Sequence, residues 1–76
     1  MSRYQLDARR LLCPMPVIRT QNMINTLTTG DTLEVTCTDP GALHDIPTWC
    51  RINGHRVITM SDVSDEIVIT IEVDGG

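Results

Sequence analysis

Aromatic residues are almost missing from this chain of 76 residues, which has one Trp, one Tyr and no Phe. The core must therefore be aliphatic, and the branched residues available for it lie in short runs, as strands require. A chain of this length is expected to form one domain, residues 1–76, and to bury only about 60 to 65% of its unfolded surface. We do not expect these residues to hold a second domain with a separate site.

Positive charge is also scarce, since the net charge is -4 and the six basic residues are all Arg. Neutralising the phosphates of a duplex needs a basic stripe, so we do not expect the chain to bind nucleic acid directly. No segment approaches the ~20 apolar residues of a membrane span, and the N-terminus has no apolar signal region. We expect a soluble, cytoplasmic protein that does not associate with a membrane.

The chain lacks paired cysteines of the kinds that form disulfide scaffolds or metal sites. Cys13, Cys37 and Cys50 include no CxxC pair, and any single disulfide would leave one of them unpaired. This count fits a reducing compartment better than a secreted scaffold. His44 and His55 are not spaced as ligands with a cysteine pair, so no metal site is predicted.

The most informative stretch that is present is Leu12–Pro16, in which Cys13 is followed by two prolines spaced by one residue. Pro14 and Pro16 fit the first turn of a helix but not its interior, which predicts that a helix begins here with Cys13 as its N-cap. Cysteine is a poor N-cap residue, so helix stability does not explain why a cysteine occupies this position. Free backbone N–H groups and the positive end of the helix would lower the pKa of Cys13 and raise its nucleophilicity.

Charged residues flank this cysteine in the sequence. Arg9, Arg10 and Arg19 could raise the local potential at Cys13 or steer an acidic partner surface to it, although solvated surface arginines are an equal alternative. Asp7 could cap or orient the loop before Cys13, or it could be a plain surface carboxylate.

The periodicity of apolar residues predicts six elements. Alternation at period two predicts four strands, at Arg3–Arg9, Thr32–Thr38, His55–Met60 and Glu66–Val73. Helical spacing predicts two helices, at Pro14–Leu27 and from Ala42 to Ile52. Thr38 and Asp39 are N-cap candidates for the second helix, and Pro47 predicts a kink or two short pieces that meet near Ile46. Residues 61–65 are expected to form a hairpin loop.

The element order βαβαββ predicts an α/β (α+β) fold, a two-layer sandwich with a four-stranded mixed sheet. Right-handed crossovers place both helices on one face of the sheet and leave the other face partly solvated. The strand at Glu66–Val73 is the most apolar and is expected inside the sheet. Functional groups collect beyond the carboxyl ends of parallel strands, and Cys13 follows the first strand.

Several segments resemble one family. Leu6-Asp7 and, after five intervening residues, Cys13-Pro14-Met15-Pro16 resemble the LDxxGxxCPxP signature of the TusA/SirA-like sulfur carrier proteins. Three further segments look like family features, and Cys50 falls where many members carry a second cysteine. These segments are Thr38-Asp39-Pro40-Gly41, Asp45-Ile46-Pro47 and Gly54-His55. The resemblance covers essentially the whole chain.

This resemblance implies a role for Cys13, which would accept sulfane sulfur as a persulfide and pass it to an acceptor protein. The donor would be a cysteine desulfurase or a rhodanese-type protein, and no cofactor beyond the covalent persulfide is expected. Pro14 and Pro16 would hold the first helical turn rigid, or would merely start the helix. The pathway stays open between tRNA thiolation, molybdenum-cofactor sulfuration and sulfur oxidation, and we expect a monomer.

One position departs from the signature, because its glycine is replaced by Arg10. Either the loop before Cys13 follows a different backbone path, or the glycine never needed a positive φ.

Two other functions fit the same residues. In a regulatory or adaptor module, Cys13 would be only a structural cap. In a thiol-redox switch, Cys50 would be a resolving thiol, although core packing also explains this residue. Asp45 is expected to be a helix-surface charge.

Overall fold

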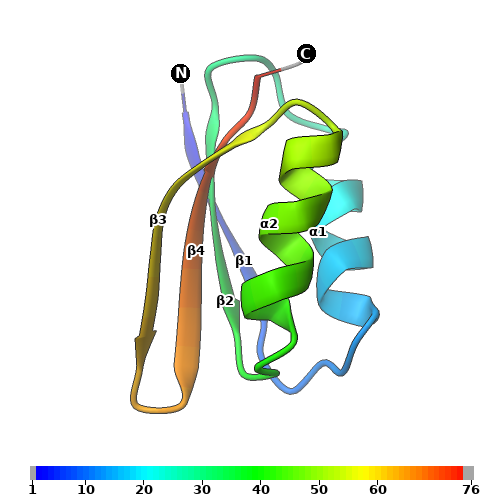
Figure 1. The fold of residues 1–76 in the computed structure, drawn as a ribbon. Helices are drawn as coiled ribbons and strands as arrows, with labels where there is room; N and C mark the ends of the chain where they lie inside the picture. The colour runs from blue at the N-terminus through cyan, green and yellow to red at the C-terminus, as the bar shows by residue number, and fades with distance from the viewer. Residues whose placement is uncertain (1, 75–76) are drawn as a thin grey trace.

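A computed structural model describes residues 2–74 and shows four strands and two helices in the order βαβαββ (Figure 1). The strands are β1 (Arg3–Ala8), β2 (Thr32–Cys37), β3 (Arg56–Val63) and β4 (Glu66–Glu72). The helices are α1 (Met15–Ile24) and α2 (Ala42–Ile52), and both lie on the same face of the sheet. The predicted two-layer sandwich is confirmed.

The sheet is mixed and has the strand order β1-β2-β4-β3. β1 pairs with β2 in parallel, while β4 lies antiparallel between β2 and β3, so the predicted interior position of the last strand is correct. Because β1 and β2 run in the same direction, the loops that follow them lie at one end of the molecule. The turn between β3 and β4 lies at this end too, at the bottom of Figure 1.

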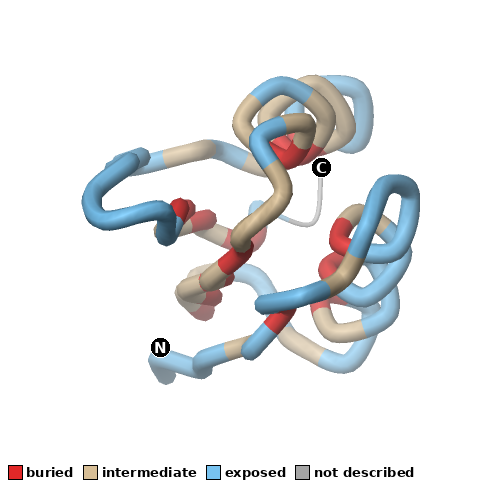
Figure 2. Tube along the Cα trace, turned by 90° about the horizontal axis from the view of Figure 1, so that it is seen from below, coloured by how far each residue is buried: buried red, intermediate tan, exposed pale blue. Residues whose placement is uncertain are grey.

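The core lies between the sheet and the two helices, where the buried residues of Figure 2 are found. Alternation along β2 turns Leu33, Val35 and Cys37 toward the helices, and all three are fully buried. Ile69 and Ile71 of β4 are fully buried beside them. Burying an aliphatic side chain of this size contributes about 1.5–3 kcal/mol, so a core without Phe still holds the two layers together.

The structure corrects two predicted boundaries. α1 ends at Ile24 rather than at Leu27, because the N–H groups of Thr26 and Leu27 bond three residues back and tighten the chain into a turn. β3 continues to Val63, so the predicted loop of residues 61–65 shrinks to Ser64-Asp65. Both turn residues have positive φ, as a two-residue type I′ hairpin requires.

α2 is one continuous helix that contains Pro47, so of the two alternatives at this proline the one of two short pieces is wrong. Pro47 lies in the second turn, where its missing N–H removes one backbone hydrogen bond. The buried face formed by Ala42, Ile46 and Cys50 packs on the sheet on both sides of the proline. Tertiary packing of this face stabilises the helix despite the proline. No helix within residues 2–74 is long and apolar enough to cross a membrane.

Candidate functional site

Cys13 lies in the loop between β1 and α1, at the end of the sheet where the carboxyl ends of β1 and β2 meet. The N-cap of α1 is Pro14, so the prediction that Cys13 is the N-cap is wrong by one residue. Pro16 occupies the second position of the helix and is buried, as its missing N–H allows. The peptide bond between Cys13 and Pro14 is cis.

Two carboxylates contact Cys13 from the second crossover. The backbone N–H of Cys13 donates a hydrogen bond of 2.8 Å to Oδ2 of Asp39. Its Sγ donates a hydrogen bond to Oδ2 of Asp45, at a distance of 3.1 Å. The expectation that Asp45 is only a helix-surface charge is therefore wrong.

The start of α2 positions these carboxylates. Asp39 follows β2 and accepts a hydrogen bond of 3.1 Å from the backbone N–H of Gly41 through Oδ1. Gly41 is the N-cap of α2, so neither Thr38 nor Asp39 is the cap that the sequence suggested. Asp45 lies in the first turn of α2, where a negative charge interacts favourably with the helix dipole. The local structure of α2 thus holds both carboxylates at the Cys13 loop.

The pKa of Cys13 is raised above its ordinary value, whereas the sequence predicted that it is lowered. The hydrogen bond to Asp45 is the largest cause, followed by removal of the thiol from water and by the negative charges of Asp45 and Asp39. The expected helix N–H groups do not reverse this effect, because Cys13 lies outside the helix. These contacts favour the protonated thiol over the thiolate.

An open hollow of about 380 Å³ lies beside the thiol, between α1 and α2. Its lining is formed by Cys13, Pro14, Val17, His44, Asp45, Thr48, Trp49 and Ile52. Ile52, one of the lining residues, is 75% exposed, so an apolar side chain of the hollow faces solvent. Leu12, the neighbour of Cys13 in the sequence, is equally exposed. None of the three arginines that flank Cys13 in the sequence lines it.

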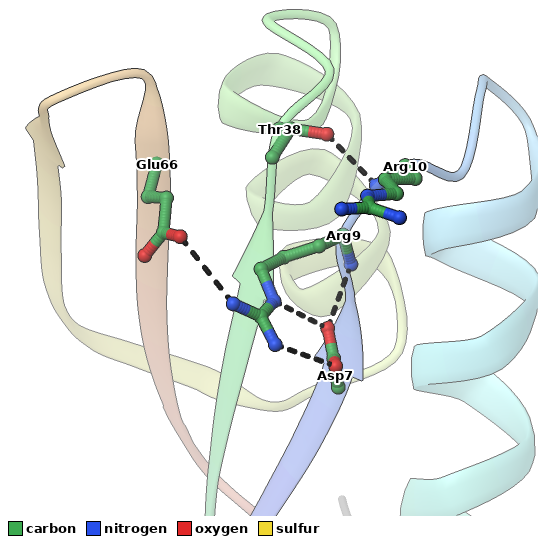
Figure 3. A network of polar contacts seen from close by, with 5 residues as sticks. All are labelled: Asp7, Arg9, Arg10, Thr38 and Glu66. Carbon is green, nitrogen blue, oxygen red and sulfur yellow. Dashed lines mark hydrogen bonds and ion pairs between the residues drawn. The ribbon is translucent and has the colours of Figure 1, made fainter.

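Arg9 instead belongs to a polar network on the other side of the loop (Figure 3). Its guanidinium forms two contacts with the carboxylate of Asp7, at 2.9 and 3.0 Å, and one with Glu66 at 3.5 Å. Asp7 also accepts the backbone N–H of Arg9, so it orients the start of the loop, and these bonds lower its pKa to about 2. Arg19 lies on an exposed position of α1.

Arg10 adopts a positive φ of 68°. Its backbone N–H donates a hydrogen bond of 2.9 Å to Oγ1 of Thr38, which ties the loop to the end of β2 (Figure 3). The alternative that this position needs no positive φ is therefore wrong, because the chain adopts a left-handed conformation here without glycine. For a residue with a Cβ this conformation costs about 1–2 kcal/mol.

The other two cysteines lie in the core. Cys37 and Cys50 are fully buried, and burial raises the pKa of each to about 11. Cys13 is thus the one exposed cysteine of the three. The burial of Cys50 favours core packing as its role.

The histidines have separate environments. His44 borders the hollow at Cys13, while His55 stacks on Trp49 with ring centroids 5.5 Å apart. Nδ1 of His55 accepts a hydrogen bond from the backbone N–H of Asp74. Among residues 2–74, no three His, Cys, Asp or Glu side chains gather as a set that could hold a metal ion.

Sequence reasoning missed Asp39 and Asp45 as neighbours of the thiol. The sequence did contain a signal, since Asp39 lies two residues after the end of β2 and the carboxyl ends of parallel strands share one edge of the sheet. The contact made by Asp45 depends on how closely α2 packs against the Cys13 loop, which no spacing in the sequence reports.

Comparisons with known proteins agree on one family. The family model described as "Sulfurtransferase TusA" matches residues 4–73. YrkI of Bacillus subtilis (strain 168), by name a candidate sulfur carrier protein, is 40% identical over 67 residues, which are 88% of this chain and 89% of YrkI.

Two further proteins are similar to the chain. YrkF of Bacillus subtilis (strain 168), also a candidate sulfur carrier by name, is 38% identical over 53 residues, which are 70% of this chain but only 29% of YrkF. The crystal structure of a SirA-like protein from Desulfitobacterium hafniense superposes with a TM-score of 0.83. It is 20% identical, and the match covers 93% of this chain and 97% of that one, so it shows the shared fold.

Proposed function

The chain belongs to the TusA family of sulfur carrier proteins, and on this premise we propose that Cys13 accepts sulfane sulfur as a persulfide and relays it to an acceptor protein. The observation that carries the proposal is the exposure of a single thiol. Cys13 faces solvent beside an open hollow, whereas Cys37 and Cys50 are fully buried. A partner protein can reach only Cys13 without unfolding the domain.

The transfer is a nucleophilic exchange in which sulfur moves and no net oxidation occurs. The thiolate of Cys13 attacks the outer sulfur of a persulfide on the donor. A bond forms between Sγ and that sulfur, the S–S bond of the donor breaks, and the donor cysteine leaves as a thiol with the proton that Cys13 lost. An acceptor thiolate then attacks the outer sulfur in the same way and regenerates the Cys13 thiol.

The surrounding residues suit this role. Pro14 lines the hollow and Pro16 is buried at the start of α1, so together they limit the movement of the loop that carries the thiol. The network of Asp7 and Arg9 supports the same loop from its other side. Arg10 and Arg19 are then available for contacts with a partner away from the thiol itself, while Arg9 supports the loop through Asp7 and Glu66.

The family implies interaction with sulfur-donor and sulfur-acceptor proteins. We propose a cysteine desulfurase or a rhodanese-type protein as the donor, and an acceptor in tRNA thiolation, cofactor sulfuration or sulfur oxidation. The sulfur travels as a covalent group on Cys13, so no dissociable cofactor takes part. A monomer in the cytoplasm, where a free thiol stays reduced, fits this cycle.

The test is to incubate the protein with a persulfide donor and to measure its intact mass. We expect a gain of one sulfur atom that dithiothreitol removes. Cys13→Ser should show no gain, while the matched variants Cys37→Ala and Cys50→Ala should still show it. The proposal fails if the native protein gains no sulfur, or if Cys13→Ser gains as much as the native protein.

A further inference from the structure

The side chains around Cys13 carry negative charge on one side of the thiol. Among residues 2–74, the titratable groups that face it are Asp39, from the loop between β2 and α2, and His44 and Asp45, from α2. α1 contributes only the apolar Val17 to the lining of the hollow. No arginine lines the hollow, so the environment of this thiol is acidic.

Arg9 and Arg10, the two arginines that precede Cys13 in its loop, face other carboxylates. The guanidinium of Arg9 is occupied by Asp7 and Glu66. Arg10 lines a different hollow, of about 520 Å³, which also contains Asp65 and Glu66. Any anion formed at Sγ of Cys13, whether a thiolate or a bound persulfide anion, therefore lies beside the carboxylate of Asp45, in a hollow that no described arginine lines.

The rim of the thiol site is apolar. Pro14, Val17, Trp49 and the strongly exposed Ile52 line the hollow, and Leu12, the neighbour of Cys13 in the sequence, is strongly exposed as well. A partner that covers this surface would remove both the apolar rim and the carboxylate of Asp45 from water. Burying Asp45 in that way is costly unless the partner supplies a positive charge.

We propose that the surface around Cys13 docks partners that bring a cationic side chain, set among apolar ones, to the carboxylate of Asp45. This inference rests on the proposed function of Cys13, and it gives Asp45 the part of a residue that selects the partner. In the free protein, Asp45 holds the thiol proton, so Cys13 reacts slowly with small electrophiles. The partner's cation pairs with Asp45, weakens its hold on that proton and lets the thiolate form where the persulfide is presented.

Charge selectivity of thiol–disulfide exchange tests this proposal without any persulfide. Cys13 attacks one sulfur of a probe disulfide, a new S–S bond forms, the probe's S–S bond breaks, and the other half of the probe leaves as a thiol. Two probes are used at low salt, the dication cystamine and the dianion 3,3′-dithiodipropionate. Each rate is divided by the rate of the same probe with 2-mercaptoethanol, which removes the intrinsic reactivity of the probe.

We expect the native protein to favour cystamine by about tenfold or more, and raised salt to reduce this preference. Asp45→Asn should lower the preference several-fold and should speed up alkylation of Cys13 by neutral iodoacetamide. The matched control is Asp62→Asn, an exposed carboxylate on β3 that changes the net charge equally. This control should keep both the preference and the alkylation rate of the native protein.

Equal preferences in Asp45→Asn and Asp62→Asn would overturn the proposal, because net charge alone would then explain them. A native protein that prefers the dianionic probe would overturn it too, and this measurement needs no variant. Formation of a persulfide on Cys13 is measured separately from the preference between the two probes. If the preference is found but no persulfide forms, the proposed function fails, and if a persulfide forms without the preference, only the present inference fails.

Discussion

The backbone N–H of Cys13 donates a hydrogen bond of 2.8 Å to Oδ2 of Asp39, a residue 26 positions further along the chain. The other oxygen of this carboxylate accepts the N–H of Gly41 at the start of α2. One side chain thus connects the two crossover loops that meet at the end of the sheet. Asp39 is a structural support of the thiol site, in contrast to Asp45, which contacts the sulfur itself.

Replacing Asp39 should loosen this connection. We expect Asp39→Ala to lower the free energy of unfolding by about 1–2 kcal/mol, because two backbone N–H groups lose their acceptor. Urea unfolding followed by circular dichroism measures this change. Asp62→Ala, which removes an exposed carboxylate from β3, should stay within about 0.5 kcal/mol of the native protein. Equal stability of the two variants would contradict a supporting role for Asp39.

Cys50 should matter for stability and not for sulfur transfer. Its side chain is fully buried in the core, so Cys50→Ser places a hydroxyl where it must find a new hydrogen-bond partner. We expect a loss of about 1–3 kcal/mol in urea unfolding. Cys13→Ser, at an exposed position, should change stability by less than about 0.5 kcal/mol.

Cys50→Ser also distinguishes a sulfur carrier from a thiol-redox switch. Folded Cys50→Ser should still gain one sulfur atom from a persulfide donor, since only Cys13 is exposed. A disulfide between Cys13 and Cys50 that forms readily under mild oxidation of the native protein would instead support the switch.

The fold followed from the sequence because the strands alternate cleanly. Leu33, Val35 and Cys37 were predicted to share one face, and all three are fully buried against the helices. The alternation works where one face of a strand is buried. β3 is largely exposed, so the alternation did not show where this strand ends. Ser64 and Asp65 adopt positive φ although neither is a glycine, so the sequence did not indicate the two-residue turn.

The charge around the Cys13 thiol could not be predicted from the alternation of apolar residues. Proximity in the sequence suggested that Arg9 and Arg10 would act on Cys13, but Arg9 pairs with carboxylates on the far side of the loop. The groups that do act on Cys13, Asp39 and Asp45, are 26 and 32 residues away. The sign of an electrostatic effect at this site depends on packing between loops, which periodicity does not report.

Stability should fall in acid partly through Asp31. This carboxylate is 4% exposed, and hydrogen bonds from the backbone N–H groups of Ser2 and Thr28, with the Thr28 hydroxyl, lower its pKa to about 2. A pKa below the ordinary value of 3.8 means that the ionised carboxylate stabilises the folded state above about pH 4. This stabilisation is lost as the pH falls from about 4 to about 2.

Asp31→Asn should therefore be less stable than the native protein near neutral pH and should lose less stability on acidification. Urea unfolding at a series of pH values between about 2 and 5 measures the slope. Part of the slope should remain in the variant, because Asp7 has a similarly lowered pKa through Arg9. If native protein and variant have parallel pH profiles, Asp31 does not contribute in this way.

Arg10 is the position where a single substitution should stabilise the protein. Its φ of 68° is costly for a residue with a Cβ, and glycine adopts this conformation without strain. Removing a strain of about 1–2 kcal/mol is partly offset by the greater freedom of glycine in the unfolded chain, about 0.4–1 kcal/mol. Arg10→Gly should thus raise the free energy of unfolding by about 0.5–1 kcal/mol in urea.

Arg10→Ala is the matched control for this effect. It removes the same guanidinium but keeps a Cβ at the left-handed position, so the strain stays and no gain is expected. The backbone N–H that bonds Thr38 is present in both variants, which leaves the contact of the loop with β2 unchanged. If Gly and Ala stabilise equally, the arginine side chain and not its backbone conformation is the source of the cost. If only Gly stabilises, the loop that carries Cys13 keeps a glycine-type conformation at the expense of stability.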